Sequence, residues 1–268
     1  MIPMPTALRD DALAGKAVFV SGGTQGVGAA VARRAAQCGA EAVIVTGRRE
    51  ELGSQMVDEL ADLGTDAMFI RADVSVVEQA IESVTNAIAA FGRIDAVVNS
   101  AGLVERGSLL DTTPELFDRH IAINLRGPFF IMQAAVRHMI DAGIPGSIVN
   151  ILTMSAHGGQ PFLAPYSASK AAMVGLTKNA AYAHRFDRIR INGLNIGWTF
   201  TEGEDAIQRS AHGAQDGWLA DAAAALPFGK LGDPNEIADA VCFLLSDHAG
   251  IVTGSVMDWD QMVVGASG

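Results

Sequence analysis

The chain has 268 residues, of which 49% are hydrophobic and 18% charged, so it can bury a large core and does not resemble a disordered protein. Its formal net charge of -11, with no local cluster of lysine or arginine, excludes nucleic acid as an expected partner. Met1 to Leu13 contains charged residues and no apolar run typical of a signal peptide, and no later segment reaches the ~20 apolar residues of a membrane span. We therefore expect a cytoplasmic protein whose residues 1–268 form one domain and which has no membrane partner.

The two cysteines, Cys38 and Cys242, lie far apart and outside any paired-cysteine spacing. We expect each to be a small buried hydrophobic residue in a reducing compartment, and we expect no metal.

A glycine-rich loop follows the first apolar run of the chain. Ala17 to Val20 predicts a strand, and Ser21 to Gly28 leads from it into an alanine-rich helical pattern, Ala29 to Cys38. This order lets backbone N–H groups and the helix dipole face a phosphate. The candidate pyrophosphate ligands are Gly22, Thr24, Gln25, Gly26, Val27 and Gly28. A tight turn with a packed helix start would select the same glycines.

The second strand, Ala42 to Val45, is followed by Gly47, Arg48 and Arg49. A site specific for NAD would place a carboxylate here, whereas a guanidinium can hold a 2′-phosphate. The pattern favours NADP over NAD, although NAD is possible. The alternative is that both arginines are solvated at the start of a helix over 50–63.

The third strand, Ala67 to Ile70, precedes Asp73, and the fourth, Ile94 to Val98, ends in Asn99-Ser100-Ala101-Gly102. Asp73 can accept a hydrogen bond from an adenine amino group or cap the helix that starts near Val76. Small residues at a strand's carboxyl end let a ligand lie close to the backbone.

The second half continues the alternation of helices and strands. A long helix opens at Thr113-Pro114, carries Asn124 in an apolar context, and is expected to kink near Pro128. Further strands are predicted over 147–152, 190–195 and 255–258, a last helix over 234–245, and the least regular part of the chain over 197–227. This pattern predicts a single α/β domain with a doubly wound parallel sheet of about seven strands and helices on both faces.

Tyr166 and Lys170 are spaced one helical turn apart, which places them on nearly the same helix face with a rise of roughly 6 Å. A fixed cation stabilises a phenolate, which a tyrosine needs to exchange protons at neutral pH. The alternative is a partly exposed tyrosine over a solvated lysine.

In combination, the glycine loop, Asp73-Val74, Asn99 to Gly102, Asn124, Tyr166-x-x-x-Lys170 and Gly232-x-Pro234-x-Glu236 resemble the short-chain dehydrogenase/reductase family from Gly15 to Asp260. The resemblance implies a Rossmann-type fold, NADP(H) or NAD(H) as cofactor and a homotetramer or homodimer. It implies cofactor contacts at Val74, Asn99, Ala101, Gly102, Tyr166, Lys170, Gly197 and Thr201, besides the residues named above.

The resemblance also implies the catalytic roles. Tyr166 is the general acid/base, Lys170 lies on the nicotinamide ribose and lowers the pKa of Tyr166, and Asn124 holds a water for proton relay. The family serine that orients the substrate oxygen is replaced by Thr153, thirteen residues before Tyr166. Threonine keeps a hydroxyl, and Ser155 is the alternative.

The substrate is expected to meet Ser155, His157, Gln160, Trp198 and Trp218, with Val104, Glu105 and Phe162 nearby. His157 and Gln160 can bind hydroxyls, although His157 can equally be a loop residue bonded to backbone. The segment 197–227 is expected to be a substrate-binding lid. Its five carboxylates against one arginine, a formal -4, disfavour anionic substrates.

The sequence therefore predicts an oxidoreductase that transfers a hydride between NADP(H) and a secondary alcohol or ketone, with a neutral polyol, sugar or simple carbonyl compound as substrate. The alternatives are a β-ketoacyl thioester reductase and, in another class, a catalytically silent cofactor-binding regulatory protein.

Overall fold

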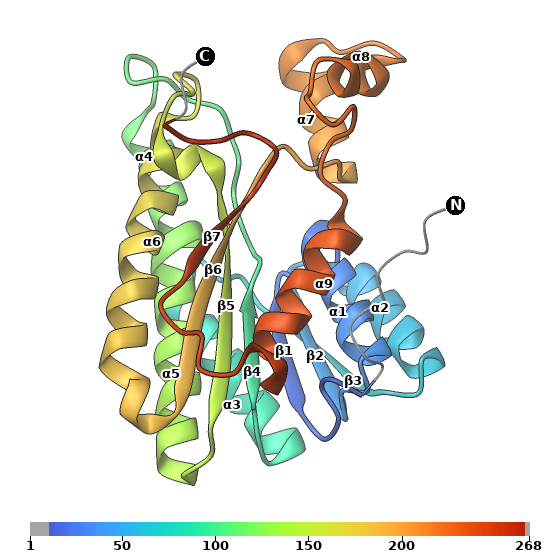
Figure 1. The fold of residues 1–268 in the computed structure, drawn as a ribbon, viewed down its shortest axis with the longest axis vertical. Helices are drawn as coiled ribbons and strands as arrows, with labels where there is room; N and C mark the ends of the chain where they lie inside the picture. Colours follow the sequence, from blue (N-terminus) through green and yellow to red (C-terminus); the bar gives the residue numbers. More distant parts are fainter. Residues whose placement is uncertain (1–10, 266–268) are drawn as a thin grey trace.

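The computed structural model describes residues 11–265, and residues 1–10, most of the segment in which the sequence shows no signal-like run, lie outside this range. Seven parallel strands form one sheet in the order β3-β2-β1-β4-β5-β6-β7 (Figure 1). The strands are β1 (Ala17–Ser21), β2 (Ala42–Gly47), β3 (Asp66–Arg71), β4 (Ala96–Asn99), β5 (Gly146–Thr153), β6 (Ile189–Ile196) and β7 (Val256–Trp259). The predicted doubly wound α/β fold is confirmed.

Two layers of helices cover the two faces of the sheet (Figure 1). One face carries α1 (Gly26–Gln37), α2 (Glu50–Asp62) and α9 (Pro234–Leu245). The other carries α3 (Val77–Phe91), α5 (Gly127–Ala142) and α6 (Ala164–His184). The remaining helices are α4 (Pro114–Ile121), α7 (Glu202–His212) and α8 (Trp218–Ala224).

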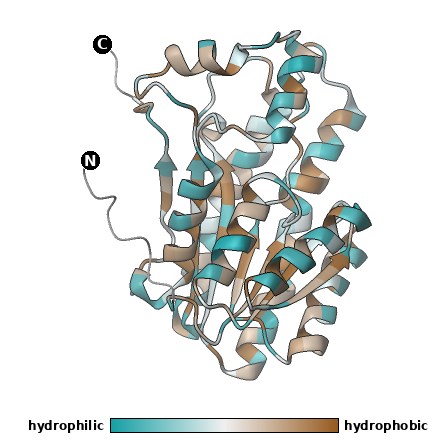
Figure 2. Cartoon of the chain, turned by 90° about the vertical axis from the view of Figure 1, so that its right-hand side faces the viewer, coloured by the Kyte–Doolittle hydropathy of each residue, from teal (hydrophilic) through white to brown (hydrophobic). Residues whose placement is uncertain are grey.

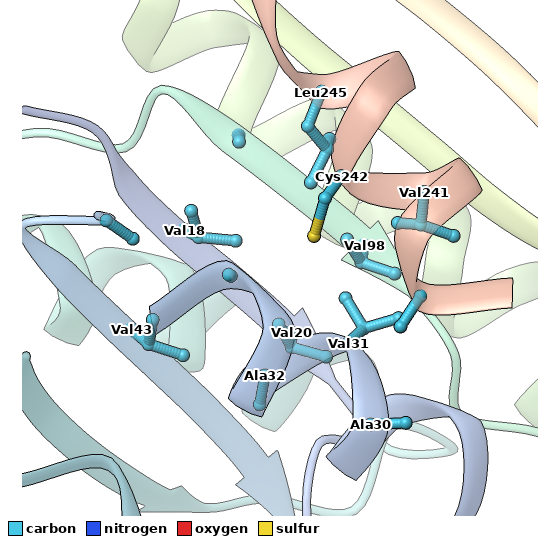
Figure 3. Close-up of a cluster of buried hydrophobic side chains, with 14 of the residues drawn as sticks. Val18, Val20, Ala30, Val31, Ala32, Val43, Val98, Val241, Cys242 and Leu245 are labelled. Carbon is cyan, nitrogen blue, oxygen red and sulfur yellow. The ribbon is translucent and has the colours of Figure 1, made fainter. Parts of the chain in front are cut away.

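Alternation along each strand divides the core into two clusters. Val18 and Val20 of β1 pack under α1 and α9, whereas Ala17 and Phe19 point to the other layer. Figure 3 shows the first cluster, in which Cys242 of α9 lies among valines of the strands and α1. Both cysteines are buried, as predicted, and Figure 2 shows apolar strands beneath helices with hydrophilic outer faces.

Two helices begin with a side-chain cap followed by a proline. Thr113 caps α4 by accepting from the Leu116 amide at 3.2 Å, and Asp233 caps α9 by accepting from the Asn235 amide at 2.8 Å. In each case a proline follows at the first helical position, where its missing N–H leaves no bond unmade.

The structure adds detail to two expectations about helices. The break near Pro128 is a π-helical turn, η1 (Ala122–Arg126), which joins α4 to α5 and contains Asn124. The segment 197–227, expected to be the least regular part of the chain, contains the helices α7 and α8.

No helix within residues 11–265 is long and apolar enough to cross a membrane. The same range contains no group of three or more histidine, cysteine or acidic residues arranged to hold a metal. Helix α6 leaves Ala171, Ala172 and Gly175 exposed, and Tyr182 is 70% exposed. Assembly into a dimer or tetramer through such a face stays a prediction.

Candidate active site

A cavity of about 1560 Å³ opens at the carboxyl ends of the parallel strands. We call the part lined by residues of 22–27, 47–49 and 72–75 the glycine-loop end. We call the part lined by residues of 104–106, 160–163 and 198–212 the lid end. Thr153, Tyr166 and Lys170 line the same cavity. Residues from both halves of the chain therefore meet in one cleft, as a doubly wound sheet requires.

The glycine loop leads directly from β1 into α1. Gly22 has φ +75°, and a Cβ there would lie 2.6 Å from the Ala101 nitrogen, while a Cβ on Gly28 would lie 2.1 Å from the Gly22 oxygen. Gln25, at the N-cap of α1, makes no side-chain capping bond. The first-turn N–H groups of α1 are thus left without a side-chain cap beside the cleft, which suits an anion.

Five of the six predicted loop ligands line the cleft: Gly22, Thr24, Gln25, Gly26 and Val27. Gly28 does not. Its role in the structure is the close approach of α1 to the loop, which any side chain would prevent.

Arg48, Arg49, Asp73 and Val74 line the glycine-loop end, and both arginines are exposed. Arg49 donates to the side-chain oxygen of Gln25. Burial acts to raise the pKa of Asp73, but hydrogen bonds from Ser75 and the charge of Arg48 outweigh it, so the pKa is lowered.

The predicted capping role of Asp73 is wrong. Helix α3 has Val76 at its N-cap, with no side-chain capping bond, and Asp73 instead accepts from the Ser75 amide and hydroxyl at 2.9 and 2.7 Å. This local turn orders the chain after β3 and leaves Asp73 on the cleft wall.

Ala101 and Gly102 line the cleft after β4, whereas Asn99 lies outside its lining. The Asn99 side chain is buried and donates to Asn150 Oδ1 at 2.8 Å. It therefore joins two neighbouring strands beneath the site.

Thr153, Tyr166 and Lys170 converge where β5 ends and α6 begins, and all three are buried. The Thr153 hydroxyl lies close enough to Tyr166 to lower its pKa through a hydrogen bond. Lys170 Nζ donates to the Ile151 carbonyl at 2.8 Å, which fixes the ammonium beneath the cleft. The alternative of an exposed tyrosine over a solvated lysine is therefore wrong.

Burial is the largest influence on the pKa values of Tyr166 and Lys170. It raises the pKa of Tyr166, the hydrogen bond with Thr153 acts next and lowers it, and the charges of Glu204 and Arg106 follow, which raise and lower it respectively. Burial also lowers the pKa of Lys170, to about 8. In the protein by itself the net shift of Tyr166 is thus upward, opposite to the effect that the resemblance assigns to Lys170.

Asn124 lies behind the cleft and not on its lining. Its Oδ1 accepts from the Leu103 amide at 2.7 Å, and its Nδ2 is 3.0 Å from both the Leu103 carbonyl and Ser169 Oγ. Asn124 thereby ties the chain after β4 to α6, and the water-relay role stays a prediction.

Sequence reasoning missed His120, one turn before Asn124. His120 Nδ1 lies 3.2 Å from Asn124 Nδ2, and Nε2 lies 3.1 Å from the Glu105 carbonyl. The ring is buried, and burial together with the charge of Arg119 lowers its pKa to about 4. A neutral His120 can therefore accept from Asn124 and donate to Glu105. The i, i+4 spacing to Asn124 was the available signal.

The predicted substrate residues separate into two groups. Ser155, Gln160, Trp198, Val104 and Phe162 line the cleft. The Ser155 hydroxyl donates to Gln160 Oε1 at 2.7 Å, whereas Thr153 acts on the pKa of Tyr166, and which of the two orients the substrate stays a prediction.

Three predicted substrate residues lie outside the cleft lining. His157 points to β7, where its Nε2 lies 2.9 Å from Asp258 Oδ1, so it is bonded to a side chain and not to backbone. Trp218 stacks behind Trp198 and donates to Asp205. Glu105 pairs with Arg119 at the surface.

Gly197 and Thr201 begin the segment that is expected to form the lid, and both line the cleft. A Cβ on Gly197 would lie 2.1 Å from Asp260 Oδ1, so any larger residue there would displace the Asp260 side chain. Thr201 caps α7 by accepting from the Glu204 amide at 3.0 Å.

The carboxylates of the segment 197–227 are only partly paired with its one arginine. Asp205 and Asp216 both pair with Arg209, whereas Glu204 faces the cleft. Arg106, which sequence reasoning did not single out, lies 3.8 Å from Glu204 across the lid end. At the lid end one carboxylate and one guanidinium therefore face each other, and the expectation that the segment 197–227 disfavours anionic substrates stays a prediction.

Comparisons with known proteins agree with this geometry. Residues 22–261 match the family model described as enoyl-(acyl carrier protein) reductase. The chain is 32% identical to the L-rhamnose 1-dehydrogenase (NAD(P)(+)) of Sphingomonas sp. (strain SKA58), with 91% of this chain and 94% of that protein covered.

Solved structures are similar over the same extent. One is a short chain dehydrogenase/reductase family protein, 35% identical, with a TM-score of 0.79 over 93% of this chain and 97% of the other. Another is a NAD+-bound xylitol dehydrogenase, 29% identical, with a TM-score of 0.84 over 92% and 98%. The chain therefore belongs to the short-chain dehydrogenase/reductase family, whose members are oxidoreductases that use NAD(P)(H) on alcohol and carbonyl groups.

Proposed function

We propose that this protein transfers a hydride between NADP(H) and a secondary alcohol or ketone, with a neutral polyol, a sugar or a simple carbonyl compound as substrate. The observation that carries the proposal is the continuity of the cleft. One cavity of about 1560 Å³ connects the glycine loop and Arg48 with the buried Thr153, Tyr166 and Lys170. A dinucleotide and a small substrate need such a connected site.

The residues at the glycine-loop end fit a phosphorylated dinucleotide. The uncapped start of α1 offers backbone N–H groups to a pyrophosphate, and Gly22 and Gly26 keep side chains out of its way. Arg48 and Arg49 lie where β2 ends, and Gly47 stands where an NAD-specific site would have a carboxylate. This donor set supports NADP(H).

The nicotinamide, when bound, donates or accepts the hydride. Tyr166 donates a proton to the substrate oxygen during reduction and accepts one during oxidation. Thr153 holds the substrate oxygen beside Tyr166, and Lys170 supplies a fixed positive charge from beneath. Asn124 holds the chain after β4 in place at Leu103, which shapes the wall of the cleft.

Two observations support a neutral substrate. The facing charges of Glu204 and Arg106 cancel at the lid end, so no net charge favours an anion there. Two similar proteins are named as dehydrogenases of L-rhamnose and of xylitol, both of which are neutral polyhydroxy compounds.

A panel of alcohols, sugars, ketones and acyl thioesters, assayed with NADP(H) and NAD(H) side by side, tests the proposal. We expect turnover of neutral hydroxy or carbonyl compounds, with the higher kcat/KM for NADP(H). Much higher activity on β-ketoacyl thioesters would contradict the substrate class. Tight NADPH binding without turnover on any member would indicate the silent regulatory protein instead.

A further inference from the structure

Two charged side chains face each other across the lid end without forming a closed ion pair. Arg106 comes from the loop after β4, and Glu204 from the first turn of α7. Arg106 Nη2 lies 3.8 Å from Glu204 Oε1, which exceeds hydrogen-bond distance. Both side chains are mostly buried, with exposures of 19% and 14%. Each therefore retains hydrogen-bonding capacity on the cleft wall.

Each partner is held in place by other contacts. Glu204 Oε1 accepts from Trp198 Nε1 and from Gln208 Nε2, both at 2.8 Å. Arg106 donates through Nε to His212 Nε2 at 3.3 Å and through Nη1 to the Val104 carbonyl at 3.2 Å. Within the described residues, these bonds leave Arg106 Nη2 and Glu204 Oε2 with no hydrogen-bond partner.

We propose that Arg106 and Glu204 form a recognition site for a second hydroxyl of the substrate, so that the substrate is a neutral polyhydroxy compound and not a simple ketone or monoalcohol. The inference rests on the proposed function and narrows its substrate class. A hydroxyl accepts and donates at once, so one group can accept from Nη2 and donate to Oε2. Hydrogen bonds to charged partners are stronger than those between neutral groups.

The surroundings suit a carbohydrate-like molecule. Phe162 and Trp198 line the same end of the cleft, and Arg106 lies 5.6 Å over the Phe162 ring. Trp198 is stacked on Trp218 with ring centroids 6.1 Å apart, which holds it as a flat apolar wall for C–H groups. Neutralised charges beside aromatic faces disfavour both anions and cations.

The pair also lies near the reacting end of the cleft. After burial and the hydrogen bond with Thr153, the charges of Glu204 and Arg106 act on the pKa of Tyr166 in opposite directions. Charges act appreciably only over short distances or through a low-dielectric interior. Because Arg106, Glu204 and Tyr166 line one cavity, one small molecule can place a hydroxyl at the pair and its reacting carbon beside Tyr166.

The test compares NADP+-linked oxidation of 2-butanol, 1,3-butanediol, 2,3-butanediol, erythritol and 3-hydroxybutyrate, which share a four-carbon skeleton. The wild-type protein should show a kcat/KM at least tenfold higher for its best polyol than for 2-butanol. In the Glu204→Gln and Arg106→Gln variants this ratio should fall about tenfold, whatever happens to the absolute rates.

Glu202→Gln is the matched control, because Glu202 is exposed on the same turn of α7 and lies outside the cleft lining. Its polyol to 2-butanol ratio should equal that of the wild type. Glu204→Gln keeps one acceptor oxygen for Trp198 and Gln208, and unchanged thermal unfolding would show that the lid still folds.

Three results would overturn the inference while the proposed function stands. One is an unchanged ratio in both variants, another is equal wild-type activity on 2-butanol and every polyol. The third is a preference for 3-hydroxybutyrate, which would assign Arg106 to a carboxylate. If no compound is oxidised, the proposed function fails by itself.

Tryptophan fluorescence then tests the hydroxyl site separately, because Trp198 donates to Glu204. Erythritol should change the emission of the wild type and of Glu202→Gln, with at least tenfold weaker binding in Glu204→Gln. No change with the wild type would overturn the site.

Discussion

At the glycine-loop end, one short loop contributes Gly22, Thr24 and Gly26 to the cleft lining, beside residues of 47–49 and 72–75. At the lid end it is lined by long side chains from distant segments, such as Arg106 and Glu204, which lie 98 positions apart. Backbone positions are fixed by the fold, whereas side-chain pairs change with single substitutions. The first end therefore suits a constant ligand, and the second suits a ligand that differs among relatives.

The sharpest test of this division is Tyr166→Phe, which removes one buried hydroxyl and leaves the glycine-loop end untouched. We expect turnover to fall by about 10³-fold, because proton transfer to the substrate oxygen is lost. NADPH affinity, measured by fluorescence titration, should stay within about twofold. Near wild-type turnover would refute the role of Tyr166, and lost NADPH binding would show that the two ends are not separable.

Thr153 and Ser155 allow a comparison within the reacting group. Thr153→Val keeps the shape but removes the hydroxyl, and we expect kcat/KM to fall by about 10²-fold, the effect of losing one placed donor. Thr153→Ser should restore most of the activity. Ser155→Ala should have the smaller effect, since its hydroxyl is bonded to Gln160. The opposite order of losses would assign the role to Ser155.

His120, which lies behind the lid end, should make the free energy of unfolding depend on pH. Its pKa is lowered from 6.5 to about 4, so the unfolded chain binds more protons between these values. Its contribution to stability is complete above pH 6.5 and is lost as the pH falls toward 4. The free energy of unfolding should therefore drop by about 2 kcal/mol between pH 7 and pH 5 through this residue.

Urea unfolding at both pH values checks this expectation. His120→Gln should lack that part of the drop, while His184→Gln, at a half-buried site paired with Asp187, should retain it. Equal pH dependence in all three proteins would contradict the shifted pKa of His120.

The smallest expected effect concerns the glycine-loop end alone. Arg48→Gln should raise the KM for NADP about tenfold and leave the KM for NAD unchanged, because the guanidinium is lost from the expected 2′-phosphate position. Arg33→Gln, which alters an arginine paired with Glu59 on the outer surface of α1, should change neither value. A parallel rise for both cofactors would show that Arg48 does not distinguish them.

The sequence was informative where function depends on neighbours in the chain. The run from β1 through the glycine loop to α1, and the spacing of Tyr166 and Lys170, are local patterns, and the structure places both on the cleft. Alternating apolar strands and amphipathic helices likewise determine the layered fold.

Other features depend on packing between distant segments. Arg106 meets His212 and Glu204 only because the lid folds over the loop after β4, and no local pattern marks it. The direction of His157 toward Asp258 depends on β6 and β7 pairing beside it. One signal was available: Thr201 and Glu204 have the spacing of a helix start, which predicts α7 within the segment expected to be the least regular.

The π-helical turn η1 has a consequence for how stability and activity are balanced in this chain. A π turn uses weaker backbone geometry than an α turn, and such turns are frequently found at functional sites. Here it contains Asn124, which fixes the wall of the cleft at Leu103. We expect deletion of one residue from 122–126 to give a more regular helix, in which the side-chain amide of Asn124 points away from Leu103. The shape of the active site therefore depends on this π-helical turn, although a regular α-helix would have the more favourable backbone geometry.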